Sequence, residues 1–340
     1  MTGVLWLADS YDLLILDLDG TVYLGPEAIP GAAAGIAAAA GRGSRIAYAT
    51  NNAARRASEV AAHLIDLGIP AQAADITTAA EVAAALAAQH LTPGDPVLIV
   101  GGPALRGEVA DAGLMPVSGA DDKPHAVIQG YAADVGWRQL AEACVAVRGG
   151  ATWIATNADK TLPSPRGPLP GNGSLVAALA TALGREPDVI VGKPAPALFH
   201  RAAERIEASR PLVVGDRLDT DIAGAVAAKM DSLFVLTGVS TPTDLLAAPA
   251  EHRPTFIASG LDGLVGGAVG VPVVDRSGAA ESGGWTARPA EDGLDLVGSG
   301  TPLHALAALA GAVWAQDGVR AAGAFEVRTT DPAVRALLDG

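Results

Sequence analysis

Short apolar runs alternate with longer segments of helical period along most of the chain. The run Leu13–Leu16 is apolar on both faces over a strand-sized length, which predicts a buried strand. The alanine-rich residues 31–40, followed closely by glycine, predict a helix, and residues 45–50 return as a strand. Strand, helix and strand in this order form a βαβ unit, so we expect a parallel sheet.

The same alternation continues down the chain. It predicts further strands at 97–100, 126–128, 153–156, 189–191, 212–214 and 233–236, and helices at 55–67, 81–89, 137–147 and 196–208. The expected fold class is therefore α/β, with a Rossmann-like doubly wound parallel sheet. Residues 277–284, rich in Ser and Gly, predict a flexible loop or linker. A hairpin-like segment at 285–297 and a helix at 303–316 are expected beyond it.

Composition narrows the class of protein. The 340 residues contain 23 Lys plus Arg against 37 Asp plus Glu, a net charge of −14 that disfavours nucleic acid and anionic membrane surfaces as partners. The length predicts two or three domains. Cys144 is the single cysteine, so neither an intrachain disulfide nor a multi-cysteine zinc site is expected, and a cytoplasmic location fits best. We expect neither a membrane-spanning helix nor an export signal.

Carboxylates follow two of the predicted strands. Asp17 and Asp19 come after the first strand, and Asp216, Asp219 and Asp221 come after strand 212–214. Ligands of open parallel sheets bind at this carboxyl edge. Carboxylates so close together need a cation or hydrogen-bond donors to offset their repulsion, and an all-oxygen set without histidine suits Mg²⁺. A polar turn at the first strand and helix capping at the second remain the alternatives.

Anion-binding groups follow two other strands. Thr50-Asn51-Asn52 places a hydroxyl and two amides before a predicted helix, which favours an anion cradle, although these residues also form turns and caps. Lys193 follows strand 189–191 and is one of only four lysines. Pro194 excludes a Walker loop, and a solvated loop lysine is the alternative.

Taken together, these segments resemble a known family. Asp17-x-Asp19-Gly20-Thr21, Thr50-Asn51-Asn52, Lys193-Pro194 and Gly215-Asp216-x-x-x-Thr220-Asp221 resemble the four ordered motifs of the haloacid dehalogenase (HAD) phosphohydrolases. The motifs span residues 13–236. The Thr-Asn-Asn form and the large insert before the lysine resemble subfamily IIA, which includes phosphoglycolate, pyridoxal phosphate and 4-nitrophenyl phosphate phosphatases.

The resemblance implies a role for each carboxylate. Asp17 is the expected nucleophile, forming an aspartyl-phosphate, and Asp19 is the expected general acid and base. The expected cofactor is Mg²⁺, held by the Asp17 and Asp216 carboxylates and the Asp19 backbone carbonyl, with Asp221 reached directly or through water. The resemblance also implies that the other phosphoryl oxygens are bound by a second set of residues, namely Thr50, Asn51, Asn52 and Lys193.

The spacing of the motifs predicts the domain organisation. The 143 positions from Thr50 to Lys193 far exceed the roughly 30 of a simple crossover, which predicts an inserted α/β cap. We expect a catalytic core at 1–77 and 186–265, the cap at 78–185 and a C-terminal region at 271–340. That last region resembles the partial acetyltransferase-like (GNAT) extension of actinobacterial glycerol 3-phosphate phosphatases. Residues 320–325 only approach an acetyl-CoA loop, since Phe325 stands where Gly or Ala belongs, so no acetyl-CoA binding is expected.

Specificity is expected in the cap. The segment around Asn157 and Asp159 resembles the substrate-specificity loop of related caps and would hydrogen-bond a small polyol, with a polar turn as the alternative. The resemblance favours hydrolysis of glycerol 3-phosphate. The alternatives are a 2-phosphoglycolate or broad-range phosphatase and a non-catalytic phosphometabolite-binding regulator, which would need neither Asp17 nor Asp19. The expected partner is a small-molecule phosphate ester, without nucleic acid or membrane insertion, and a homodimer stays open.

Overall fold

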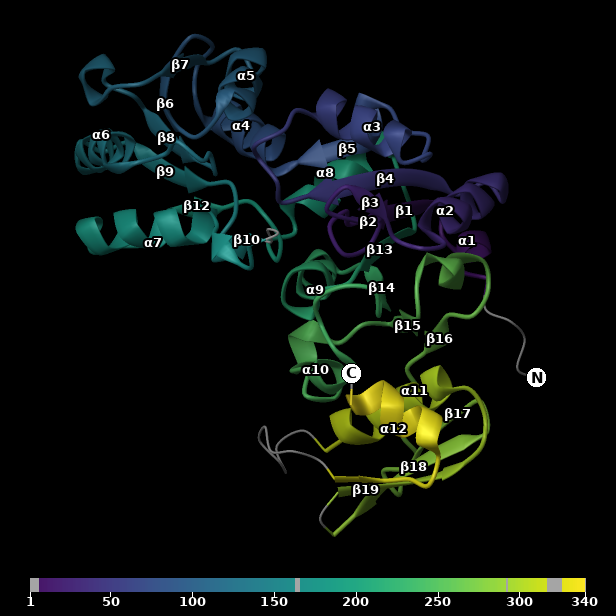
Figure 1. Cartoon of the computed structure of the whole chain (residues 1–340). Coiled ribbons are helices and arrows are strands. Elements are labelled where there is room, and N and C mark those ends of the chain that lie inside the picture. Colours follow the sequence, from purple (N-terminus) through teal and green to yellow (C-terminus); the bar gives the residue numbers. More distant parts are fainter. Residues whose placement is uncertain (1–5, 163–165, 292, 317–325, 340) are drawn as a thin grey trace. The chain divides into compact units, whose positions relative to one another are not determined.

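The structure is a computed structural model that describes residues 6–162, 166–291, 293–316 and 326–339 (Figure 1). The chain forms two compact units. The first contains Met1–Ile46 and Glu207–Gly340, and the second contains Ala47–Ile206. Within the described ranges, no helix combines the length and the apolar character needed to cross a membrane.

A parallel sheet with strand order β15-β14-β13-β1 forms the centre of the first unit, and β16 adds an antiparallel edge. The register pairs Leu16 with Val214 and Gly215 with Phe234, so the carboxyl ends of β1, β13 and β14 lie along one edge. All four residues of β1 are buried, as expected for a run that is apolar on both faces. The strands are β1 (Leu13–Leu16), β13 (Pro211–Gly215), β14 (Asp231–Val235), β15 (Phe256–Ala258) and β16 (Val269–Gly270).

Short helices and turns surround this sheet. Helix α2 packs on η5 so closely that a Cβ on Gly35 would lie 2.6 Å from the carbonyl oxygen of Leu261. The elements are α1 (Leu7–Ser10), β2 (Tyr23–Leu24), β3 (Glu27–Ala28), α2 (Ala32–Gly41), η3 (Leu218–Ile222), α9 (Ala223–Ala228), α10 (Pro242–Leu246), η4 (Ala250–His252) and η5 (Leu261–Val265).

The C-terminal region adds a four-stranded sheet of order β17-β18-β19-β20, on which α11 packs. Leu306 and Leu309 of α11 share one buried cluster with Phe234 and Ile257, so this region and the central sheet have a common core. The elements are β17 (Ala280–Ser282), β18 (Trp285–Ala290), β19 (Gly293–Gly298), α11 (Pro302–Trp314), β20 (Glu326–Arg328) and α12 (Pro332–Asp339).

Two predictions for this region have different outcomes. The hairpin at 285–297 is confirmed by the antiparallel pair β18 and β19. The prediction of a flexible loop or linker at 277–284 is wrong for Ala280–Ser282. These residues form strand β17, because they pair with β18 and bury Ala280. The likeness to a GNAT extension stays a prediction, and residues 320–325 lie outside the described residues.

A five-stranded parallel sheet of order β12-β9-β8-β6-β7 forms the centre of the second unit. One face packs on α6 and α7, where Trp153 and Val127 join a single apolar cluster with Val147 and Leu179, while α4 and α5 contact β8 and β6. The elements are α4 (Ala79–His90), β6 (Pro96–Val100), α5 (Pro103–Asp111), β7 (Met115–Val117), η2 (Ala120–Asp122), β8 (Ala126–Gln129), α6 (Trp137–Arg148), β9 (Thr152–Ala155), β10 (Thr161–Leu162), β11 (Leu169–Pro170), α7 (Asn172–Leu183) and β12 (Val189–Ile190).

Strand β4 passes from the first unit into the second and pairs in parallel with β5. The remaining elements are β4 (Arg45–Thr50), α3 (Ala57–Asp66), η1 (Ala73–Asp75), β5 (Ile76–Thr78) and α8 (Ala197–Ile206). The prediction of an α/β fold with parallel sheets is confirmed. Strands β5, β7 and β15 were missed because they are three residues long and carry no apolar run of strand length.

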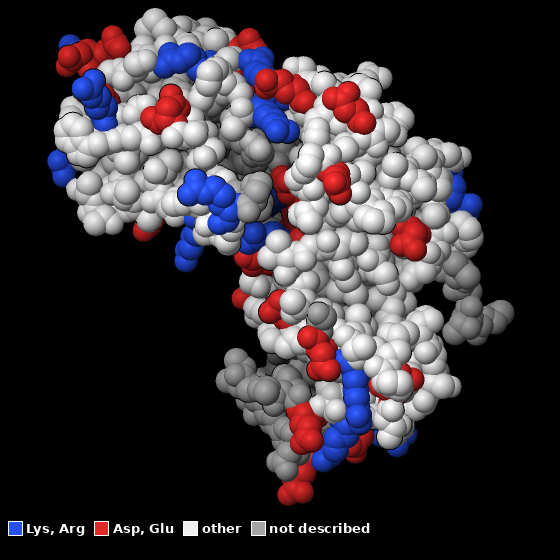
Figure 2. All heavy atoms as spheres, in the orientation of Figure 1, with Lys and Arg blue, Asp and Glu red and all other residues white. Residues whose placement is uncertain are grey.

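Acidic and basic side chains are interspersed over the face of the molecule seen in Figure 2, and most of that face is uncharged. This distribution agrees with a chain in which charged residues make up 18% of the sequence and acidic ones outnumber basic ones.

Candidate active site

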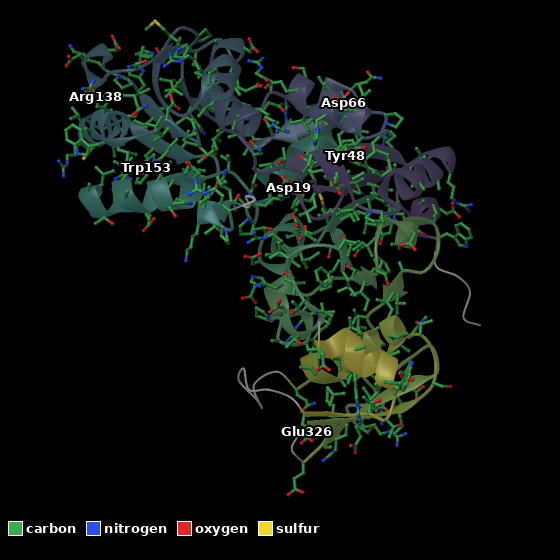
Figure 3. All side chains as sticks on the ribbon, viewed as in Figure 1. Asp19, Tyr48, Asp66, Arg138, Trp153 and Glu326 are labelled. Carbon is green, nitrogen blue, oxygen red and sulfur yellow. The ribbon has the colours of Figure 1, made fainter. Side chains whose placement is uncertain are left out.

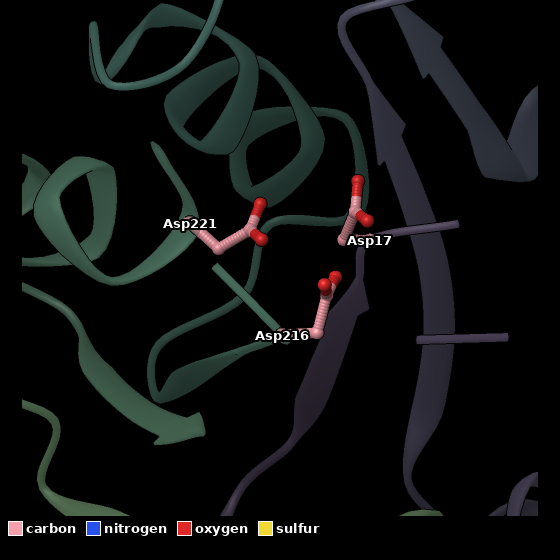
Figure 4. A group of neighbouring side chains, drawn as sticks. All are labelled: Asp17, Asp216 and Asp221. Atoms are coloured by element: carbon pink, nitrogen blue, oxygen red, sulfur yellow. The ribbon is translucent and has the colours of Figure 1, made fainter. Parts of the chain in front are cut away.

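Three carboxylates converge at the carboxyl edge of the first unit's sheet (Figure 4). Asp17 follows β1, Asp216 follows β13 and Asp221 lies in η3. One carboxylate oxygen from each residue lies within 4.8 Å of those of the other two, and the residues are only 8%, 0% and 1% exposed. Because β1 and β13 are adjacent and in register, residues some 200 positions apart in the sequence are brought together here.

Asp216 is held in one orientation by both of its oxygens. The Thr21 hydroxyl donates to Oδ1 at 3.2 Å, and the backbone N–H of Val239 donates to Oδ2 at 2.7 Å. The backbone also closes tightly around this carboxylate, since a Cβ on Gly20 or Gly238 would lie 2.5 or 2.0 Å from Oδ2. These two glycines leave the carboxylate one position.

Asp221 and its neighbour Asp219 take different roles. The backbone N–H of Arg217 donates to Asp221 Oδ2 at 3.1 Å, whereas the Arg217 side chain pairs with Asp219 at 2.9 and 3.1 Å. Burial opposes ionisation of Asp219, but its hydrogen bonds and the charge of Arg217 prevail and hold the pKa of Asp219 below its usual value. Asp219 therefore lies in a local ion pair with Arg217 at the start of η3, and this pair is not a helix cap.

Asp19, labelled in Figure 3, lies in the turn after β1. Its side chain is exposed. The turn is closed by the N–H groups of Val22 and Tyr23, which donate to the Leu18 carbonyl at 2.8 and 3.1 Å. Within the described residues, the Asp19 carboxylate is not one of the converging group. Its expected backbone-carbonyl contact with a metal stays a prediction.

A polar network occupies the strand ends of the second unit. Asn51 exchanges hydrogen bonds with the backbone of Lys193, accepting from its N–H at 2.7 Å and donating to its carbonyl at 3.1 Å. Its amide also donates to the Asp159 carboxylate at 3.2 Å. Lys193 is 4% exposed, and its ammonium donates to the Ala49 carbonyl at 3.2 Å. Lys193 is therefore a buried, positioned ammonium, which disfavours the solvated loop alternative.

The same network includes the predicted specificity loop. The Asn157 amide donates to the Asn51 carbonyl at 2.7 Å, and its oxygen accepts from the Asp159 N–H at 3.2 Å. Thr50 is 3% exposed. Asn52 does not share the burial of Thr50. Its side chain is exposed, and its side-chain oxygen accepts from the Ala54 N–H at 2.8 Å, as in a turn.

Some residues of these sites were missed by sequence reasoning. Gly238 and Val239 follow β14 and contact Asp216. The small and polar residues after the predicted strand 233–236 could have pointed to them, because the carboxyl end of this strand also lies at the ligand edge of the sheet. Asn172 lies in the segment 170–174, which also resembles the specificity loop, but its hydrogen bond to the carbonyl of Asn157 at 2.8 Å was not predicted.

Comparison with known proteins shows the family of the chain. Residues 14–115 match the family model of haloacid dehalogenase-like hydrolases, and residues 190–264 match a second, HAD-hydrolase-like model. D-glycerol 3-phosphate phosphatase of Mycobacterium tuberculosis is 51% identical over 258 residues, which cover 76% of this chain and 72% of that protein. The chain belongs to the HAD-like hydrolases.

Three further proteins are similar to most of this chain. An acid sugar phosphatase of Staphylococcus saprophyticus is 36% identical over 73% of this chain and 95% of its own. The crystal structure of a glycerol phosphate phosphatase from M. tuberculosis in complex with magnesium covers 98% of both chains, with 43% identity and a TM-score of 0.88. A 4-nitrophenylphosphatase from Thermotoga maritima covers 76% of this chain and 98% of its own, with 31% identity and a TM-score of 0.70.

Proposed function

We propose that this HAD-like hydrolase is a Mg²⁺-dependent phosphomonoesterase that hydrolyses glycerol 3-phosphate to glycerol and phosphate through an aspartyl-phosphate. The buried group of Asp17, Asp216 and Asp221 is the observation that carries the proposed activity. The proposed substrate is supported by the 51% identity to an M. tuberculosis protein named for that activity.

The donor set fits a hard cation. Three carboxylates this close and this buried repel one another unless a cation or hydrogen-bond donors offset their charge. Donors already reach both oxygens of Asp216 and offset part of this charge, and a bound cation would offset the rest. Asp17, Asp216 and Asp221 would hold Mg²⁺, with the Asp19 backbone carbonyl as a further ligand. When bound, the ion offsets the repulsion between an anionic nucleophile and a phosphate.

The proposed reaction has two steps. In the first, a carboxylate oxygen of Asp17 attacks phosphorus, the bond from phosphorus to the glycerol oxygen breaks, and Asp19 gives its proton to that oxygen. In the second, water attacks phosphorus while Asp19 takes its proton. The bond from phosphorus to the Asp17 oxygen breaks, which releases phosphate and restores the Asp17 carboxylate. The exposure of Asp19 suits a group that must exchange protons with leaving alcohol and water.

The second unit supplies the proposed binding groups. Thr50, Asn51 and Lys193 would hold phosphoryl oxygens, and the buried ammonium of Lys193 gives the strongest electrostatic contribution. Asn157 and Asp159 would hydrogen-bond the glycerol hydroxyls. Asn52 is also a proposed phosphate-binding residue. Its side-chain oxygen accepts from the Ala54 N–H in a turn, and its backbone N–H donates to the Thr50 hydroxyl at 3.1 Å.

The division into a core at 1–77 and 186–265, a cap at 78–185 and a C-terminal region at 271–340 is part of the proposal. Helices on both faces of the five-stranded sheet support an α/β cap. A cytoplasmic location is also proposed, because a chain with the single cysteine Cys144 draws no stability from intrachain disulfides. A homodimer stays a prediction.

A broad-range phosphatase is the second candidate. The similarity to an acid sugar phosphatase and to a 4-nitrophenylphosphatase favours it. The two candidates share every proposed residue of the first unit and differ in how strictly the second unit selects the alcohol.

The test is phosphate release from a panel of esters with and without Mg²⁺. We expect the highest kcat/KM for glycerol 3-phosphate and no turnover after chelation. Asp17→Asn should abolish turnover, while Asp66→Asn, the same change at an exposed position of α3, should have no effect. Appreciable turnover in Asp17→Asn protein would refute the assigned nucleophile, and equal rates across the panel would favour the broad-range alternative. Tight ester binding by the wild type without any turnover would favour the regulator.

A further inference from the structure

A buried group of amides lies at the carboxyl ends of β8 and β9 in the second unit. Gln129 ends β8, and Asn172 is the first residue of α7, and both are at most 1% exposed. Gln129 Oε1 accepts from the indole N–H of Trp153 at 3.0 Å (Figure 3 labels Trp153). The polar group is therefore built into the core of the five-stranded sheet.

Asn172 joins this core to the predicted specificity loop. Its amide donates to the Asn157 carbonyl at 2.8 Å and to the Gln129 carbonyl at 3.4 Å. The Gln129 carbonyl also accepts from the N–H of Thr156 at 2.8 Å. One carboxamide thus ties together the end of β8 and the residue that begins the loop.

The start of α7 supports the rest of the loop. The Gly173 N–H donates to the Asp159 carbonyl at 2.9 Å. A Cβ on Gly171 or Gly173 would lie 2.4 Å from the Asp159 oxygen or 2.2 Å from the Ala158 oxygen. The loop backbone therefore rests directly on the helix start, and the Asn172 side chain is the polar group that fixes its first residue.

This arrangement is costly for stability. Among the described residues, Gln129 Nε2, Thr156 Oγ1 and Asn172 Oδ1 are buried without a protein hydrogen-bond partner. A buried polar group without a hydrogen bond lowers the stability of a core, whereas an apolar side chain of the same size would not carry this cost. We therefore look for the role of Asn172 in the position of the loop residue that its amide holds, and not in the stability of the core.

We propose that Asn172 is a positioning residue for selection of the leaving alcohol. It acts through Asn157, whose carbonyl it holds and whose side chain in turn holds the Asn51 backbone at 2.7 Å. This inference rests on the proposed function, in which Asn157 and Asp159 bind the hydroxyls of the alcohol. An ester whose alcohol has no further hydroxyls does not use these contacts.

The test compares two esters in variants of α7. Asn172→Asp keeps the side-chain shape but turns an oxygen toward two carbonyl oxygens, and Asn172→Ser removes the amide. Thr181→Ala is the control, because it removes one side-chain hydrogen bond from an exposed position of the same helix. We expect Asn172→Asp to lower kcat/KM for glycerol 3-phosphate roughly 10- to 100-fold, and to lower that for 4-nitrophenyl phosphate much less.

An equal loss for both esters, or no loss in folded protein, would overturn the proposal. If Asn172→Asp does not fold, Asn172→Ser is judged by the same criteria. Hydrogen exchange gives a readout independent of the substrate: exchange at residues 157–160 should rise in the variant while the amides of α7 stay protected. Unchanged exchange there would also overturn the inference. Wild-type protein that fails to prefer glycerol 3-phosphate would instead count against the proposed function, and the exchange result would still decide the role of Asn172.

Discussion

Gly238 lies against the Asp216 carboxylate, and replacing it with alanine displaces that carboxylate without changing its chemistry. A Cβ built on Gly238 would lie 2.0 Å from Asp216 Oδ2, whereas ordinary contact begins near 3.4 Å, a shortfall of 1.4 Å. Asp216 is fully buried, and its Oδ2 also accepts the Val239 N–H at 2.7 Å, so a displaced side chain loses this hydrogen bond and its place in the carboxylate group. A misplacement of about 1 Å costs on the order of 100-fold in rate.

Gly238→Ala should therefore lower kcat for phosphate release about 100-fold, and overpacking should destabilise the fold by about 1–3 kcal/mol. Gly41→Ala is the matched control, because a Cβ there meets nothing within 4 Å and the residue ends helix α2. Assays at saturating Mg²⁺, with urea unfolding of both variants, separate lost activity from lost fold. Wild-type kcat in Gly238→Ala protein, or an equal loss in the control, would refute the argument.

Four further outcomes are expected. Asp19→Asn should lower kcat by a factor of about 100 or more with an unchanged Tm, because its exposed side chain serves proton transfer and not packing; a shifted Tm would point to a structural role. Mg²⁺ should raise the Tm of the wild type but not of Asp216→Asn, as measured by thermal shift, and an equal rise would place the ion elsewhere. Leu306→Ala should cost about 2–5 kcal/mol in urea unfolding, since this fully buried side chain belongs to the shared core; a single early transition confined to the C-terminal region would contradict that shared core. Burial opposes ionisation of Asp12, but hydrogen bonds from the Ser209 N–H and hydroxyl outweigh it and hold the pKa of Asp12 below 3.8. The ionised carboxylate therefore stabilises the fold above that pH, and this stability is lost as the pH falls through the lower pKa of the folded protein. Asp12→Asn should flatten this loss of stability at acidic pH, as measured by urea unfolding at several pH values.

Much of the fold follows from local patterns. Runs such as Leu13–Leu16 are apolar on both faces, which only a strand buried between two layers satisfies, and their boundaries were predicted to within a residue or two. Short strands such as β5 and the small β17 were not predicted, because they depend on pairing with a neighbouring strand and not on their own apolar content.

The site divides in the same way. The sequence by itself determined which residue types follow which strands: carboxylates after β1 and β13, a hydroxyl and amides after β4, a lysine after β12. Since chain direction fixes which end of a parallel strand faces the ligand edge, that order was enough to predict an all-oxygen group containing Asp17 and Asp216.

Only the tertiary structure decided which of these groups are buried and what holds them. The family resemblance already favoured Asp221 over Asp219, and the structure adds that Asp221 is buried beside Asp17 and Asp216 whereas Asp219 pairs with Arg217. The glycine contact on Asp216 and the bond from Asn172 to Asn157 join residues from different elements, so no local pattern encodes them. The physical reason is that residue type and spacing set the direction of a side chain along its own element, while burial and hydrogen bonding depend on the other elements that pack against it.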